Sequence, residues 1–223
     1  MHTELLTEWL TLWPPTEGAV ATFINLSENH TYRIDIAGQP RFILRLHRPG
    51  YQSTAAIESE LAWIKALRTD TTLPVPEPLP GTNGKLVQSV DGRPGVLFTY
   101  QPGREALEAD DTASLFQTLG RYAALTHNHA QSFAPPPSFS RQKWSAAAIL
   151  DADGLWGDWR KAPHVDGEIR RTLDALDAAL RLALDAYGQT PDRFGLIHAD
   201  MRLANVLIDG ETIRLIDFDD CGF

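Results

Sequence analysis

Three polar residues near the carboxyl end of the chain, His198, Asp200 and Asn205, are spaced as H-x-D-x-x-x-x-N. Apolar stretches precede and follow them, so the motif is expected in a loop between two short strands. At this spacing an Asp can orient or deprotonate an attacking hydroxyl while an Asn holds a magnesium ion. The pattern therefore indicates the catalytic loop of a phosphoryl-transfer enzyme. A packed core histidine beside polar turn residues is the alternative interpretation.

A second acidic segment, Leu-Ile-Asp-Phe-Asp at 215–219, follows shortly after this loop. Phosphoryl transfer needs oxygen ligands that converge on Mg²⁺ beside the phosphates, and carboxylate and amide oxygens meet that need. Asn205 and Asp217 would lie at the ends of adjacent short strands. We therefore expect these two residues to supply the metal ligands.

The first hundred residues carry strand-like segments separated by turn residues. The expected strands are 19–26, 31–37, 41–47, 85–90 and 96–100. Turns are expected at 38–40 and 91–95. Apolar residues recur at helical spacing over 53–68, and a shorter helix is expected over 4–13.

The pattern changes after a Gln-Pro-Gly break at 101–103. The helices expected beyond it are 112–133 and 165–187, and the short apolar strands are 194–198, 205–208 and 213–216. We therefore expect an α+β fold in two lobes. An antiparallel sheet with one helix would form the N-terminal lobe over 1–100, and a mostly helical lobe would cover 101–223.

With these motifs, the chain from about Ala19 to its end resembles the aminoglycoside phosphotransferase and choline kinase family, a branch of the protein-kinase-like fold. It is most similar to the branch of homoserine kinase, hydroxylysine kinase and a bacterial stress-response kinase. The resemblance implies ATP and Mg²⁺ as cofactors, Asp200 as catalytic base, His198 as support for the loop, and Asn205 and Asp217 as metal ligands. It also implies a fold truncated at the C-terminus, because such proteins continue for roughly another hundred helical residues.

The resembling families place a phosphate-binding cation, usually Lys, on the third strand, where this chain has Arg45 in F-I-L-R. Arg keeps the charge but is longer and planar. Its partner should be a Glu on the next helix. At 100° per residue, Glu60 lies roughly 40° from the centre of the apolar face and Glu58 roughly 120° away. A carboxylate on an apolar face needs a partner, so we expect Glu60, although a hydrated rim position is the alternative.

The loop between the first two strands stands where a kinase has its Gly-rich loop, but it contains no G-x-G-x-x-G. Ser27, Asn29 and Thr31 are expected to bind the nucleotide there, since backbone N–H groups and hydroxyls can meet phosphate oxygens. An ordinary hairpin turn fits the same residues equally well.

The remaining expected contacts are implied by the resemblance alone. Thr99 and Gln101 would belong to a hinge whose backbone meets adenine. The acceptor would lie over Asp200, with Arg202 and Asp219 beside it.

The composition excludes several other classes of protein. The chain has 223 residues and a net charge of −9, without a block of Lys and Arg, which argues against a nucleic-acid or membrane partner. The lone cysteine, Cys221, permits no internal disulfide. Neither a signal peptide nor a stretch of roughly 20 apolar residues is apparent. These observations favour a cytoplasmic protein.

Three functions fit the sequence. The first is transfer of the ATP γ-phosphate to a hydroxyl of a small molecule of the aminoglycoside, amino-alcohol or hydroxy-amino-acid type. The second is a protein Ser/Thr kinase, although Ala199 replaces the H-R-D arginine and no A-P-E segment follows. The third is a non-catalytic nucleotide-binding fragment. Because the expected C-terminal helices are missing, we also expect exposed apolar surface on the second lobe and hence self-association.

Overall fold

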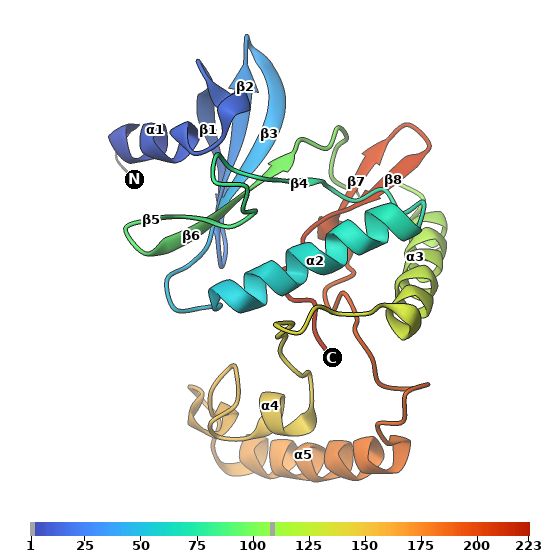
Figure 1. Cartoon of the computed structure of the whole chain (residues 1–223). Helices are drawn as coiled ribbons and strands as arrows, with labels where there is room; N and C mark the ends of the chain where they lie inside the picture. The colour runs from blue at the N-terminus through green and yellow to red at the C-terminus, as the bar shows by residue number, and fades with distance from the viewer. Residues whose placement is uncertain (1–2, 108–109) are drawn as a thin grey trace.

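The computed structural model describes residues 3–107 and 110–223 (Figure 1). Within these ranges, six strands form one antiparallel sheet in the order β1-β2-β3-β6-β4, and β5 pairs with the same edge of β6 as β4. The strands are β1 (Val20–Leu26), β2 (His30–Ile36), β3 (Gln39–Leu46), β4 (Pro78–Leu79), β5 (Gln88–Val90) and β6 (Arg93–Thr99).

Two tight turns close the hairpins of this sheet. Ala37 and Gly38 have φ of 51° and 74°, and Asp91 and Gly92 have φ of 50° and 75°. Two consecutive residues with positive φ match the twist of the flanking strands and favour two-residue hairpins. Strands β3 and β6 consequently begin earlier than the sequence predicted, and both expected turns were too long.

Helices α1 (Thr3–Thr11) and α2 (Thr54–Asp70) cover opposite faces of the sheet. Successive side chains of a strand point to opposite faces. Leu44 and Leu46 of β3 accordingly join Trp9 in one apolar cluster, and Ile43 joins the cluster that contains the buried face of α2. Arg45 shares the face of Ile43, and this alternation directs it toward α2.

Helix α2 is well specified at its N-terminus. The Ser53 hydroxyl caps the helix by accepting from the Ala56 N–H at 3.1 Å, which satisfies one of the unpaired N–H groups of the first turn. The cluster that buries this helix extends into the C-terminal part of the chain, where Val206, Leu215 and Phe218 contribute to it. The helix is therefore shared between the sheet and the proposed catalytic segments.

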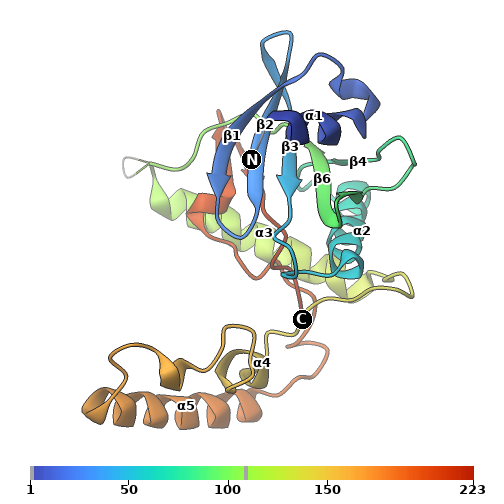
Figure 2. The same cartoon turned by 90° about the vertical axis from the view of Figure 1, so that its left-hand side faces the viewer.

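The rest of the chain is largely helical. Its elements are α3 (Thr112–Ser132), α4 (Ala146–Leu150), α5 (Gly167–Tyr187) and a hairpin of β7 (Val206–Asp209) with β8 (Thr212–Leu215). Short 3-10 turns occur at Pro14–Thr16, Trp159–Lys161 and Leu203–Asn205. Two views place α4 and α5 together, at the end of the molecule away from the sheet (Figure 1, Figure 2).

The strand expected over 194–198 is not formed. Ile197 makes only an isolated bridge to Gly222, with hydrogen bonds of 2.8 and 3.0 Å. Ala199 has a φ of 69°, which turns the chain away directly after His198. The prediction was wrong because an apolar run alone does not distinguish a strand from a buried loop.

Helix α5, within the predicted second lobe, exposes apolar side chains, as the sequence predicted. Side chains at helical spacing form a stripe along α5, and Leu182 beside them is 72% exposed. The exposed residues of this stripe are Ile169, Leu176, Leu180, Leu184 and Tyr187. No helix among the described residues is both long and apolar enough to cross a membrane.

We expect this chain to self-associate as its concentration rises, because contiguous apolar patches above about 400 Å² promote association. The double variant Leu176→Glu, Leu184→Glu should shift the chain toward monomer. Size-exclusion chromatography with light scattering over a concentration series would measure the shift. Leu107→Glu, at an exposed position outside α5, is the matched control. A monodisperse wild-type monomer at every concentration would contradict the prediction.

Candidate active site

A cavity of about 300 Å³ lies between the sheet, α2 and the β7–β8 hairpin. Apolar residues of several strands contribute to its wall, among them Ile24, Ile43 and Leu207. The residues predicted from the sequence that line it are Ser27, Asn29, Thr31, Arg45, Glu60, Thr99, Gln101, Asn205 and Asp217. Four further predicted residues do not line the cavity but are hydrogen-bonded to residues that do, directly or through one another; they are His198, Asp200, Arg202 and Asp219.

A buried ion pair lies at the inner end of the cavity. Arg45 Nη2 donates to both carboxylate oxygens of Glu60 at 2.8 and 2.7 Å, and their side chains are 8% and 0% exposed. Burial is the largest influence and opposes the charge of Arg45, but the Glu60, Asp219 and Asp217 carboxylates together outweigh it and raise the pKa of Arg45. Arg45 Nη1 also lies 3.8 Å from Asp217 Oδ1. The pair therefore connects α2 to the predicted metal site.

His198 anchors the predicted catalytic loop as a neutral imidazole. Its Nδ1 accepts the Asp200 N–H at 3.2 Å, which leaves the proton on Nε2 to be donated to Ile216 O at 3.1 Å. Burial lowers the pKa of His198 to about 4. With both ring nitrogens engaged, His198 positions the loop and is not available as a base.

Asp200 and Asn205 are bonded directly to each other. Asn205 Nδ2 donates to Asp200 O at 2.9 Å and to Asp200 Oδ2 at 2.6 Å, and Arg202 Nε donates to the same Oδ2 at 3.0 Å. Within the described part of the chain, no group donates to Oδ1 of Asp200. This geometry holds one carboxylate oxygen in place and leaves the other for a ligand.

Asp217 and Asp219 occupy different surroundings. Asp217 has a φ of 64°, and its side chain is 43% exposed at the cavity. Loss of hydration in the cleft, and then the Asp219 carboxylate, raise the pKa of Asp217. Asp219 is buried, and its Oδ2 accepts from Asn29 Nδ2 at 2.6 Å. The amide of Asn29 is thus committed to Asp219, and the carboxylate of Asp219 faces the β1–β2 loop.

The donor set suits a magnesium ion that is also bound by phosphate oxygens. Because the Nδ2 atom of Asn205 is taken by Asp200, its amide oxygen remains as a ligand, and the Asp217 carboxylate lines the same cavity. Among residues 3–107 and 110–223, no three His, Cys, Asp or Glu side chains form a metal-binding group. Mg²⁺ typically takes one or two carboxylates and completes its shell with phosphates and water.

The hinge is partly engaged by the protein itself. The Thr99 N–H donates to Glu77 O and the Tyr100 N–H to Arg41 O, both at 2.9 Å. Gln101 Nε2 donates to Thr99 Oγ1 at 3.1 Å. Gly103 follows with a φ of 129°, and a Cβ there would lie 3.0 Å from Leu207 Cβ. Glycine thus allows the connector to pass close to β7.

Sequence reasoning missed several residues of the site. Glu105 lines the cavity beyond the hinge, and Gln52 and Arg141 bond to the segment that follows Asp217. The apolar wall could have been found from the alternation of the strands. Arg141 carried no signal, because its segment has no periodicity and its partners are far away in the sequence.

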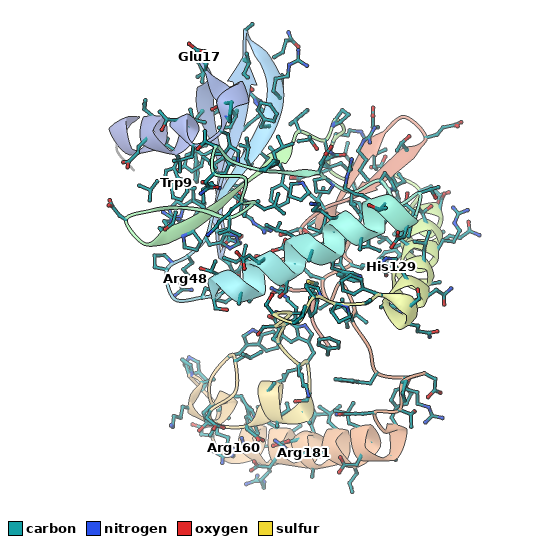
Figure 3. All side chains as sticks on the ribbon, viewed as in Figure 1. Trp9, Glu17, Arg48, His129, Arg160 and Arg181 are labelled. Atoms are coloured by element: carbon teal, nitrogen blue, oxygen red, sulfur yellow. The ribbon has the colours of Figure 1, made fainter. Side chains whose placement is uncertain are left out.

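A second cavity of about 480 Å³ lies between α4 and α5, lined by apolar residues such as Trp156 and Leu173. It contains none of the predicted residues. Arg160 and Arg181 extend beside it to Asp177, at 2.5 and 2.6 Å (Figure 3). Two carboxylates line this cavity, but Asp158 is paired with Arg160 and Lys161, and Asp177 with Arg160 and Arg181. The first cavity, which gathers the predicted residues, is therefore the candidate active site.

Known proteins place this geometry in context. Residues 20–223 match the model of a family described as the phosphotransferase enzyme family. The chain is 30% identical over 207 residues to amicoumacin kinase of Bacillus subtilis (strain 168), which covers 90% of this chain and 58% of that protein. It is 30% identical over 165 residues to homoserine kinase of Gluconobacter oxydans (strain 621H), covering 71% of this chain and 49% of that protein.

Two solved structures extend the comparison. A microcompartment-associated aminopropanol kinase is similar over 99% of this chain and 70% of its own, with 39% identity and a TM-score of 0.89. The amicoumacin kinase hAmiN, in complex with AMP-PNP, Ca²⁺ and Ami, is similar over 99% of this chain and 64% of its own, with 25% identity and a TM-score of 0.77. The chain thus spans about half to two thirds of its relatives' length. The α+β kinase-like fold is confirmed.

Proposed function

The chain belongs to the phosphotransferase enzyme family, and from that premise we propose that it transfers the γ-phosphoryl group of ATP to a hydroxyl of a small amino-alcohol. One observation carries the proposal. Asn205 and Asp217 line the cavity that also holds the Arg45–Glu60 pair, and Asn205 is bonded to Asp200. A cation, two oxygen ligands and a base are the groups that phosphoryl transfer requires.

The nucleotide would lie between an N-terminal lobe of residues 1–100 and a C-terminal lobe of residues 101–223. Apolar residues of β1, β3 and β7 would enclose adenine, and the Thr99 carbonyl and Gln101 amide are its proposed hydrogen-bonding partners. Ser27 and Thr31 would meet the phosphates from the β1–β2 loop, and Asn29 would hold that loop through Asp219. The similarity to hAmiN supports this placement, because the structure of hAmiN contains the ATP analogue AMP-PNP.

Asn205 and Asp217 would hold Mg²⁺, which supplies charge neutralisation at the transferring phosphate. The Arg45 guanidinium, kept charged and oriented by Glu60, would stabilise the phosphate oxygens from inside the cleft. Asp200 would orient the acceptor hydroxyl and take its proton through Oδ1. The hydroxyl oxygen would then bond to the γ-phosphorus as the bond to the β-phosphate oxygen breaks, and ADP would leave.

An acceptor bearing an ammonium group suits the charge at the mouth of this site. Burial, followed by the nearby Asp219, Asp200 and Glu28 carboxylates, raises the pKa of Asp220 to about 6. Such a concentration of negative charge favours a cation near Asp200. Similarity to an aminopropanol kinase supports the same class. We place this reaction in the cytoplasm, where the lone cysteine would stay reduced.

Thermal unfolding tests the nucleotide site directly. At 100 times Kd, Mg·ATP should stabilise the chain by about 2.7 kcal/mol, which corresponds to a rise in Tm of about 5 to 10 °C. The rise should require Mg²⁺ and disappear in Asp217→Ala. Asp209→Ala is the matched control, because its side chain is 42% exposed against 43% for Asp217. An unchanged Tm in a wild-type chain that unfolds cooperatively would contradict the proposal.

The acceptor class has its own test. Initial rates with 1-amino-2-propanol and with propan-2-ol, at saturating Mg·ATP, would compare two alcohols that differ by the amine. We expect the amine to raise kcat/KM by roughly tenfold or more, as one charge-assisted contact would. Equal rates for the two alcohols would contradict recognition of the ammonium group, but they would not contradict the proposed kinase activity.

A further inference from the structure

Arg141 lies in the irregular segment between α3 and α4, far from the predicted motifs. Its guanidinium donates to Cys221 O at 2.5 Å, to Gln52 Oε1 at 2.7 Å, to Ala56 O at 3.0 Å and to Asp219 O. It therefore joins the segment that follows Asp217 to the start of α2, the helix that carries Glu60.

The bonds of Arg141 are unusual for a buried cation. The residue is only 9% exposed, and no carboxylate among the described residues lies within ion-pair distance of it. Its hydrogen-bond acceptors are all neutral oxygens of the backbone or of Gln52. A buried charge with no carboxylate in direct contact depends on its hydrogen bonds to neutral groups. Moving residues 219–221 away from α2 would remove the bonds of Arg141 to Cys221 O and Asp219 O.

The segment after Asp217 is held on a second side by the neighbours of Arg141. The Trp144 N–H donates to Phe223 O at 2.6 Å, and the Phe223 N–H donates to Gln142 O at 2.9 Å. Trp144 Nε1 donates to Asp220 O at 2.9 Å. These contacts line up residues 219–223 beside the segment that contains Arg141.

Asp217 needs such support because it adopts a backbone conformation that non-glycine residues rarely keep. Its φ is 64°, and left-handed geometry persists only where the surrounding structure holds it. On its N-terminal side, the Ile216 N–H donates to Asn205 O at 3.0 Å. On its C-terminal side, Arg141 and Gln52 both donate to Asp219 O.

We propose that Arg141 is a positioning residue for the metal site: it holds residues 219–221 against the start of α2, so that the Asp217 carboxylate stays beside Arg45 and Asn205. The inference rests on the proposed kinase function. It means that the metal site is preset by the fold, with the segment after Asp217 packed in place and not left as a movable activation loop.

The test compares Arg141→Gln and Arg141→Lys with wild type by two measurements. The first measurement is the amount of AMP-PNP bound as the Mg²⁺ concentration is raised. Arg141→Gln should raise the Mg²⁺ concentration for half-maximal binding by roughly tenfold, because losing a group that supports a metal ligand typically weakens metal affinity by at least that factor. Arg141→Lys should raise it by less. Metal-free AMP-PNP affinity should change by less than about twofold, since Arg45 and the hinge remain.

The second measurement is hydrogen exchange of the metal-free chain. The amides of Cys221, Gly222 and Phe223 are hydrogen-bonded, and Arg141→Gln should accelerate their exchange while α5 stays unchanged. Arg160→Gln is the control, because Arg160 also donates to a backbone carbonyl, Leu150 O, but lies beside α5 (Figure 3). It should match wild type in both measurements.

Wild-type exchange and Mg²⁺ dependence in a folded Arg141→Gln chain would overturn the inference. Equal losses of metal-free and Mg²⁺-dependent binding would also overturn it, because they indicate a general structural role. If Arg141→Gln does not fold, Gln52→Ala removes one partner of Arg141 and one donor to Asp219 O, and unchanged behaviour there decides against the inference. If wild type shows no Mg²⁺-dependent binding, the proposed function fails, and the exchange result alone decides whether Arg141 holds the segment.

Discussion

Replacing Asp200 with Asn should lower kcat by roughly 10²–10⁴-fold, the usual contribution of a general base, while Mg·ATP affinity stays within about twofold. The Asn side chain keeps the shape but cannot take the proton of the acceptor. Asn205 retains its bond to the backbone oxygen of residue 200, at 2.9 Å, so the loop should stay in place. Initial rates and calorimetric titration with Mg·ATP would separate the two effects.

The matched control is Asp209→Asn. Asp209 lies on the β7–β8 hairpin of the same region and pairs with Arg214 at 2.9 Å, away from the cavity. Its loss should leave kcat within about twofold, because exposed ion pairs contribute little. A kcat in Asp200→Asn that equals the control would exclude Asp200 as the base. A parallel loss of Mg·ATP binding would indicate that Asp200 contributes to nucleotide binding instead.

Breaking the buried ion pair should produce the largest effect on stability. We expect Glu60→Gln to lower the free energy of unfolding by about 3–5 kcal/mol, since removing one partner leaves a buried charge uncompensated. Arg45 is 8% exposed, and its nearest remaining carboxylate atom, Asp217 Oδ1, is 3.8 Å away. Urea unfolding followed by tryptophan fluorescence would measure the change in midpoint and slope.

Glu58→Gln is the matched control, on the same helix but exposed to solvent. Such a surface change should stay within about 0.5 kcal/mol. The double variant Arg45→Met, Glu60→Met should recover much of the lost stability, because an apolar pair can replace a buried ion pair. This double variant should not catalyse phosphoryl transfer. Equal stabilities of Glu58→Gln and Glu60→Gln would show that the pair contributes nothing.

The two variants probe different parts of one arrangement. In the proposed function, Asp200 acts on the acceptor, and the Arg45–Glu60 pair binds on the phosphate side of the cleft. Both depend on α2, whose apolar face packs with Phe218 and Val206 in a shared cluster. A shift of this helix would displace Arg45, the proposed phosphate-binding cation, together with the segment of the proposed metal ligand Asp217. Arg141 also donates to Gln52 and Ala56 at the start of α2, so its proposed positioning role depends on the same helix.

Local patterns were sufficient for much of the fold. Helix α2 and strands β1, β2 and β3 lie close to the predicted ranges, because period and turn residues act over a few positions. Helical spacing also distinguished Glu60 from Glu58, and the structure pairs Arg45 with Glu60. This succeeded because the geometry of one helix places both carboxylates without knowledge of the rest.

The motif of His198, Asp200 and Asn205 could be recognised because its chemistry requires a short, constant spacing. Its exact backbone could not be derived. The predicted strand over 194–198 is a loop with a left-handed Ala199, since His198 bonds to Ile216 and Ile197 to Gly222. These partners are about twenty residues away, beyond the reach of a local pattern.

Sequence by itself determined the family resemblance, the α+β class, the residue types of the site and the apolar face of α2, because each follows from composition, spacing or period. Only the tertiary structure decided that Asn29 bonds to Asp219, that Arg141 binds the segment after Asp217, and that both cross between distant parts of the chain. Such contacts depend on where the core brings separate segments together. No local sequence pattern predicts which distant segments come into contact.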